Sequence, residues 1–152
     1  MPGKLAPLRR ADLQAPVPSN EPARAGILPV PSPAPQAAPA RKLLWTVDGT
    51  PAPGSPVSDI AKLTAAATAA VRAGDGHVLD TSHVIFPNGA ITLVLILAES
   101  HLAIHTWPEE DLVAVDLFTC GAIDSDVVVT ELINGLRLSD TRVQQVRRGA
   151  AR

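Results

Sequence analysis

The chain has 152 residues, a formal net charge of −2 and 18% charged residues, and these values are typical of a single globular domain. It contains no Tyr, two Phe, two Trp and no long run of Lys or Arg, so it lacks the stacking rings and basic surface of nucleic-acid-binding proteins. We therefore expect no nucleic-acid partner, and we interpret Arg147, Arg148 and Arg152 as a solvated chain end.

Cysteine content and the length of the apolar runs indicate the cellular compartment of the protein. Cys120 is the single cysteine, which excludes an intrachain disulfide and favours a reducing compartment such as the cytoplasm. The most apolar stretch, residues 91–98, is far shorter than the ~20 residues that a membrane-spanning helix requires. Pro and polar residues interrupt residues 1–19, so the apolar core of a secretory signal is missing there. We expect a cytoplasmic protein without a membrane segment.

The chain divides by composition into an arm and a domain. Residues 1–40 hold ten of the fifteen prolines, mixed with Ala and Ser, and this composition predicts a disordered or polyproline-like arm. An alternative role for the arm is to bind an aromatic-lined groove of a partner. Residues 41–152 then form the folded domain.

The domain begins with a predicted strand at 42–47 and a turn-rich segment that follows it. Residues 58–74 predict an amphipathic helix, with Ser58 as the N-cap, apolar positions such as Leu63 and Ala67 on one stripe, and Gly74 at its end. Further along the chain, hydrophobic patterning predicts strands at 77–86, 91–98 and 112–120, a helix at 125–138 capped by Ser125, and an edge strand at 142–148.

This order of elements predicts the α+β class: a two-layer sandwich in which two helices cover one face of a mainly antiparallel sheet. The other face of the sheet then lacks a cover. Because a domain of this size buries a smaller fraction of its surface than a larger one does, we expect a second copy to supply the missing layer, sheet against sheet.

Polar residues of types that can act in catalysis cluster where the apolar run ends, in "LAESHLAIHTWPE" (97–109), and Cys120 follows. The flanks of Ser100 do not form the G-x-S-x-G motif of hydrolases, and "HLAIH" lacks the Glu of a zinc-protease helix. A metal held by His101, His105 and Cys120 remains open. So does a purely structural interpretation, with buried histidines, a turn serine and a small buried cysteine.

"AESHLAIHTWPE" followed by "AVDLFTCG" closely resembles the prokaryotic, self-processing, pyruvoyl-dependent S-adenosylmethionine decarboxylases. The resemblance is strongest over residues 96–121 and extends more weakly over 41–149. It implies that Ser100 attacks the carbonyl of Glu99 and that the chain splits between them into a β chain and an α chain. Ser100 then becomes a pyruvoyl group, which forms a Schiff base with the substrate and serves as the cofactor, without a metal or an external cofactor.

The resemblance also assigns roles to other residues. His105 corresponds to the processing base, Cys120 to the proton donor of the decarboxylation, and Glu109 and Phe86 to substrate-binding residues. Thr92 corresponds to a hydroxyl that assists processing, although a shift of one residue would put Ile91 there. The implied activity is decarboxylation of S-adenosylmethionine, which supplies the aminopropyl donor for spermidine and other polyamines. Because one face of the sheet needs a cover, we expect a homodimer, or a larger assembly of processed β/α pairs.

Two alternatives to this assignment stay open, one for the substrate and one for the activity. The first strand lacks the acid that the family carries there, and Asp48 lies two residues further on, so a basic amino acid such as ornithine or arginine is an alternative substrate. An uncleaved, non-enzymatic paralogue is a second alternative. In a regular strand Ser100 and His105 would face opposite sides of the sheet, so we expect the chain to turn close to Ser100.

Overall fold

The computed structural model describes residues 41–149, so the predicted arm at 1–40 lies outside the described residues. The elements are β1 (Lys42–Pro51), a short 3-10 helix η2 (Pro56–Ser58), α1 (Ile60–Ala73), β2 (Val78–Ile85), β3 (Ile91–Leu97), β4 (Ser100–Trp107), a second 3-10 helix η3 (Pro108–Glu110), β5 (Leu112–Thr119), α2 (Ser125–Gly135) and β6 (Leu138–Arg148).

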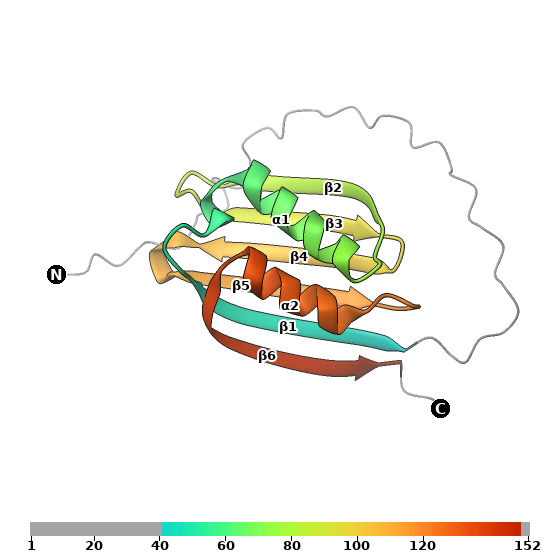
Figure 1. Ribbon diagram of the computed structural model, residues 1–152. Coiled ribbons are helices and arrows are strands. Elements are labelled where there is room, and N and C mark those ends of the chain that lie inside the picture. The colour runs from blue at the N-terminus through green and yellow to red at the C-terminus, as the bar shows by residue number, and fades with distance from the viewer. Residues whose placement is uncertain (1–40, 150–152) are drawn as a thin grey trace, which may run out of the picture. The chain divides into compact units, whose positions relative to one another are not determined.

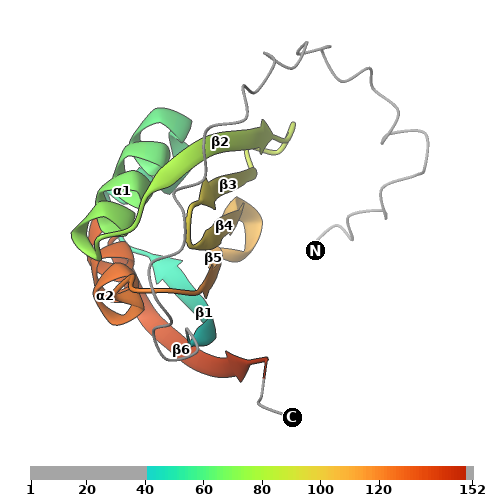
Figure 2. The same cartoon turned by 90° about the vertical axis from the view of Figure 1, so that its right-hand side faces the viewer.

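The six strands form one sheet in the order β2-β3-β4-β5-β1-β6, and every neighbouring pair is antiparallel (Figure 1). Both helices lie on the same side of this sheet (Figure 2). The predicted α+β two-layer sandwich is therefore confirmed. Strand β1 runs further than the predicted 42–47, because Gly49 pairs with Val113 of β5 and Pro51 with Leu138 of β6.

The N-cap of each helix lies one residue away from the predicted N-cap. The side chain of Asp59 accepts hydrogen bonds from the backbone N–H groups of Ala61 and Lys62, so Asp59 and not Ser58 is the N-cap of α1. Asp124 rather than Ser125 caps α2 in the same way. A carboxylate also interacts favourably with the positive end of the helix dipole, which a serine hydroxyl does to a smaller extent.

The core lies between the helices and the sheet. Alternate residues of the three central strands face the helices and are at most 2% exposed: Leu93, Leu95, Leu102, Ile104, Val115 and Leu117. From α1 and α2, buried residues such as Leu63 and Leu132 pack against them. Each such side chain contributes ~1.5–3 kcal/mol through removal of apolar surface from water.

The remaining alternate residues form what we call the open face, the side of the sheet opposite α1 and α2 (Figure 2). The register aligns Thr92, His105, Ala114 and Asp48 in one row across β3, β4, β5 and β1. Ile96 and Val146 on this face are each 46% exposed, so apolar surface faces away from the core. Among the residues that the structure describes, no helix has the length and apolar character needed to cross a membrane.

Candidate active site

The bond between Glu99 and Ser100 lies in a tight turn between β3 and β4. Leu97 pairs with Ser100, so Ala98 and Glu99 alone close the hairpin. The turn comes directly before Ser100, as expected. Ser100 has a φ of 134°, a conformation that residues with a side chain rarely adopt. Such a conformation costs on the order of 1–3 kcal/mol and persists only where the surrounding contacts enforce it.

Glu99 is held through its carbonyl and through its side chain. The backbone N–H of Cys120 donates to the Glu99 carbonyl oxygen at 2.9 Å. The backbone N–H of His77 donates to Oε2 at 3.0 Å, and Nδ1 of the same residue lies 2.9 Å from Oε1. Burial raises the pKa of the Glu99 carboxyl, but the hydrogen bonds from His77 outweigh this effect and hold the pKa below its ordinary value.

Thr92 and His105 form a second pair on the open face. They are direct neighbours in the register of β3 and β4, and Thr92 Oγ1 lies 3.0 Å from His105 Nδ1. Ile91 points to the opposite side, where it is 2% exposed in the core. The contact to His105 therefore belongs to Thr92 and not to Ile91. The Trp107 ring lies 5.8 Å from the His105 ring, centroid to centroid.

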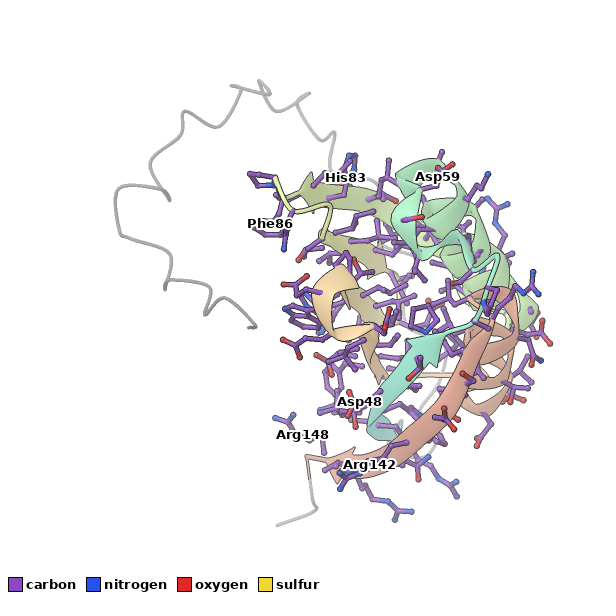
Figure 3. All side chains as sticks on the ribbon, turned by 90° about the vertical axis from the view of Figure 1, so that its left-hand side faces the viewer. Asp48, Asp59, His83, Phe86, Arg142 and Arg148 are labelled. Atoms are coloured by element: carbon purple, nitrogen blue, oxygen red, sulfur yellow. The ribbon has the colours of Figure 1, made fainter. Side chains whose placement is uncertain are left out.

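The two predicted substrate-binding residues lie at one end of the sheet. Phe86 follows β2 and is 42% exposed, and Figure 3 shows it at the turn between β2 and β3. Asn88 in the same turn donates its side-chain amide to the carboxylate of Glu109, at 3.2 Å and 3.4 Å to the two oxygens. This hydrogen bond connects the turn to η3, and it places Glu109 and Phe86 in neighbouring loops.

The predicted site residues thus form two groups within one chain. Ser100 and Cys120 lie together at the start of β4, whereas His105 lies further along the same strand. The register of β4 against β5 is continuous from Ser100 to Trp107. At ~3.3 Å per residue, five residues of strand separate Ser100 from His105 by about 16 Å. Within one chain the imidazole therefore cannot reach the α-carbon of Ser100.

The structure also bears on the metal alternative and on the missing acid. His101 and His105 are four residues apart on one strand, or about 13 Å, which is too far to bind a single ion together. No group of three metal-ligating side chains occurs among residues 41–149. Asp48 lies on the open face in the row of His105, two strands away, which is about 10 Å. An acid on the first strand therefore does share the face of His105.

Sequence reasoning missed His77 and Asn88. His77 contacts Glu99 across 22 residues of sequence, and Asn88 contacts Glu109 across 21. Neither residue belongs to a recognisable motif, and both partners are ordinary surface residue types. Only the pairing of the strands brings these side chains together, so no local signal could have identified them.

Comparisons with known proteins identify relatives of this chain. Curated relatives include "S-adenosylmethionine decarboxylase proenzyme 2" of Bacillus cereus, 34% identical over 74 residues, which is 48% of this chain and 60% of the relative. The "S-adenosylmethionine decarboxylase proenzyme" of Acidithiobacillus ferrooxidans is 51% identical over 71 residues, which is 46% of this chain and 53% of the relative. The aligned stretch thus spans little more than half the length of these relatives.

The fold has a counterpart among solved structures. The crystal structure of the adenosylmethionine decarboxylase from Aquifex aeolicus VF5 superimposes with a TM-score of 0.66 and 26% sequence identity, and it covers 76% of this chain and 96% of that chain. The sequence model of the family described as S-adenosylmethionine decarboxylase matches residues 43–149, well over half of the chain. The chain belongs to the S-adenosylmethionine decarboxylase family.

Proposed function

We propose that this protein cleaves itself between Glu99 and Ser100 and then acts as a pyruvoyl-dependent decarboxylase of S-adenosylmethionine. The observation that carries the proposal is the turn at residue 100, where a serine with a φ of 134° follows a carbonyl that accepts a hydrogen bond from Cys120. The names of the relatives, which call them decarboxylase proenzymes, support the same conclusion.

The first step of cleavage uses groups that lie next to one another. The Ser100 hydroxyl attacks the Glu99 carbonyl carbon, its proton passes to the Ser100 nitrogen, the amide C–N bond breaks, and an ester joins Glu99 to the Ser100 oxygen. The Cys120 N–H donates to the carbonyl oxygen on which negative charge develops. Attack within one chain makes a weak nucleophile effective, because well-oriented groups reach effective molarities of about 10⁵ M or more.

The second step breaks the chain. A base removes the α-hydrogen of Ser100, the ester C–O bond breaks, and Glu99 leaves as the carboxylate end of the β chain. The dehydroalanine that remains takes up water and releases ammonia, which leaves a pyruvoyl group at position 100. Its ketone supplies the electron sink that decarboxylation requires. Cys120 follows Thr119, the register partner of Ser100, and its thiol is the proposed proton donor to the product carbon.

The base is His105, and we infer that it acts on the Ser100 of a second copy. The separation of about 16 Å along β4 prevents contact within one chain. The open face carries exposed apolar residues such as Ile96 and Val146, which a facing sheet would cover. A two-fold axis between the two sheets, perpendicular to the strands, reverses the strand direction and brings the Ser100 end of one copy over the His105 end of the other.

The substrate proposal rests on Phe86 and Glu109, which lie at the end of the sheet away from Ser100. An exposed ring at Phe86 and a carboxylate at Glu109 lie in neighbouring loops and suit the base and the ribose hydroxyls of a nucleoside. The product would be the aminopropyl donor of spermidine synthesis. Assays for CO₂ release from S-adenosylmethionine, ornithine and arginine separate the candidates, and release from ornithine or arginine alone would favour the basic-amino-acid alternative. A reducing compartment such as the cytoplasm would keep Cys120 as a free thiol.

The cleavage is tested by intact mass spectrometry. The wild-type protein should yield two fragments, one that ends at Glu99 and one that begins with a pyruvoyl group at position 100. Ser100→Ala should remain whole, and Ser82→Ala, an exposed serine on β2, should cleave like the wild type. A wild-type chain that stays whole after long incubation, or a second fragment that begins with a serine amine, would support the non-enzymatic alternative.

The contribution of a second copy is tested by co-expression of two inactive variants. His105→Ala and Ser100→Ala should each remain whole when expressed alone. In a mixed dimer, the His105→Ala chain provides an intact Ser100 and its partner provides an intact His105. Up to about half of the His105→Ala chains should then be cleaved. If they remain whole while mixed dimers form, His105 does not act between copies.

A further inference from the structure

We propose that His77 is a positioning residue for the self-cleavage: it holds the Glu99 side chain and thereby keeps Ser100 in its strained conformation. The inference rests on the proposed cleavage between Glu99 and Ser100. His77 itself touches neither of the reacting atoms. It acts on the residue whose carbonyl is attacked, from the segment directly before β2 and 22 residues before Glu99 in the sequence.

A rigid turn fixes the position of His77. The segment from Gly74 to Gly76 connects α1 to β2, and the Gly76 N–H donates to the Val71 carbonyl at 2.9 Å. A Cβ at Gly74 would lie 2.5 Å from the Asp124 carbonyl oxygen, so the chain approaches α2 too closely for any side chain there. The His77 carbonyl in turn accepts from the Ala98 N–H at 2.9 Å. His77 is therefore anchored both to the helix layer and to the turn that contains the scissile bond.

The contact between His77 and Glu99 involves both carboxylate oxygens. The backbone N–H of His77 holds Oε2 and the ring nitrogen Nδ1 holds Oε1, at 3.0 Å and 2.9 Å. The Glu99 side chain is only 14% exposed, whereas the His77 side chain is 74% exposed. The ring therefore adds little to the core, and its main contact is the carboxylate. It also borders an open hollow of about 370 Å³ that Arg72 and Asp75 help to line.

The hairpin explains why Glu99 needs to be held. Short hairpin loops commonly place a residue with positive φ in or directly after the turn, and glycine is preferred there because it has no Cβ. Neither Ala98 nor Glu99 has a positive φ, and Ser100 does, at 134°. The serine thus occupies a position that suits glycine. A free Glu99 could rotate and relieve the strain, but its carboxylate is fixed by His77 and its carbonyl by Cys120.

Cleavage follows from this restraint in two ways. The restraint keeps the Glu99 carbonyl directed toward the Cys120 N–H, where the developing charge is stabilised. It also prevents the turn from relaxing before the amide bond breaks, so the strain at Ser100 is released by the reaction itself. Loss of the His77 ring should therefore slow cleavage without loss of the fold.

The test is the rate at which newly translated full-length chain becomes cleaved, followed after translation is stopped. His77→Ala should slow cleavage about tenfold, because it removes a hydrogen bond to a charged group. His77→Asn retains a side-chain N–H near the position of Nδ1 and should recover most of the rate. The matched control is His83→Ala, an exposed histidine on β2, labelled in Figure 3, which lies six residues or about 20 Å beyond His77.

A double-mutant cycle separates positioning from a general structural role. In a Glu99→Ala background, His77→Ala should have no further effect, because its partner has already been removed. The proposal is overturned if His77→Ala cleaves at the wild-type rate, or if it slows the Glu99→Ala chain by the same factor as the wild type. A wild-type chain that never cleaves overturns the proposed function as well, and this outcome is distinct from cleavage that ignores His77.

Discussion

Thr92→Val is the sharpest test of the contact that orients His105. Valine has nearly the shape of threonine, but it lacks the hydroxyl that lies 3.0 Å from His105 Nδ1. A neutral hydrogen bond of this kind contributes about 0.5–1.5 kcal/mol, which corresponds to about a twofold to twelvefold slower cleavage if the bond persists in the transition state. Both residues are half-buried, so water can replace the lost partner, and the free energy of unfolding should change by less than about 1 kcal/mol.

The assay measures cleavage and stability on the same preparations. The rate is taken from the loss of full-length chain after translation, and stability from urea unfolding of the same variants. Thr92→Ser keeps the hydroxyl and should cleave at nearly the wild-type rate, which separates the hydrogen bond from the methyl group. If Thr92→Val cleaves as fast as the wild type, or if Thr92→Ser is as slow as Thr92→Val, then this hydrogen bond does not orient the base.

Four further changes test other parts of the structure. Cys120→Ala should still be cleaved but should release CO₂ from S-adenosylmethionine much more slowly, because the proposed proton donor is lost; normal turnover would exclude that role. Leu63→Ala, at a fully buried core position, should lower the free energy of unfolding by about 2–5 kcal/mol in urea titrations. Gly74→Ala should cost about 1–3 kcal/mol in the same titrations, since its Cβ would meet a carbonyl oxygen at 2.5 Å. The backbone N–H of Lys62 holds the pKa of Asp59 below its ordinary value of 3.8. The charged carboxylate therefore stabilises α1 above that pH, and this stabilisation is lost as the pH falls. Asp59→Asn should remove this part of the pH dependence of thermal unfolding.

The fold could be predicted from the sequence because its signals are local. Stripes of apolar residues at helical spacing marked α1, and a run of β-branched residues marked β3. The exact caps could not be predicted, since Ser58 and Asp59 are both good capping residues and only the approach of the chain to α1 decides between them. The extension of β1 depends on β5 and β6, which pair with it from distant parts of the sequence.

The candidate site was predictable as a set of residues but not as an arrangement. The resemblance identified Ser100 and His105, yet only the strand register assigns the hydroxyl near His105 to Thr92 rather than to Ile91. The contact between His77 and Glu99 joins residues that show no common pattern in the sequence. Such contacts depend on which strands become neighbours, and a single sequence does not carry that information locally.

The distance between Ser100 and His105 depends on the secondary structure that joins them. On an α-helix, five residues would advance the chain by only about 7.5 Å, and two side chains could serve one site. On β4 the same five residues span about 16 Å, so Ser100 and the proposed base lie at different ends of the strand. If His105 acts between copies as proposed, the chain must fold and pair with a second copy before it can complete the cleavage. In that case an unpaired or partly folded chain would lack the base at its Ser100, and this separation would protect the backbone until the assembly that uses the proposed pyruvoyl group exists.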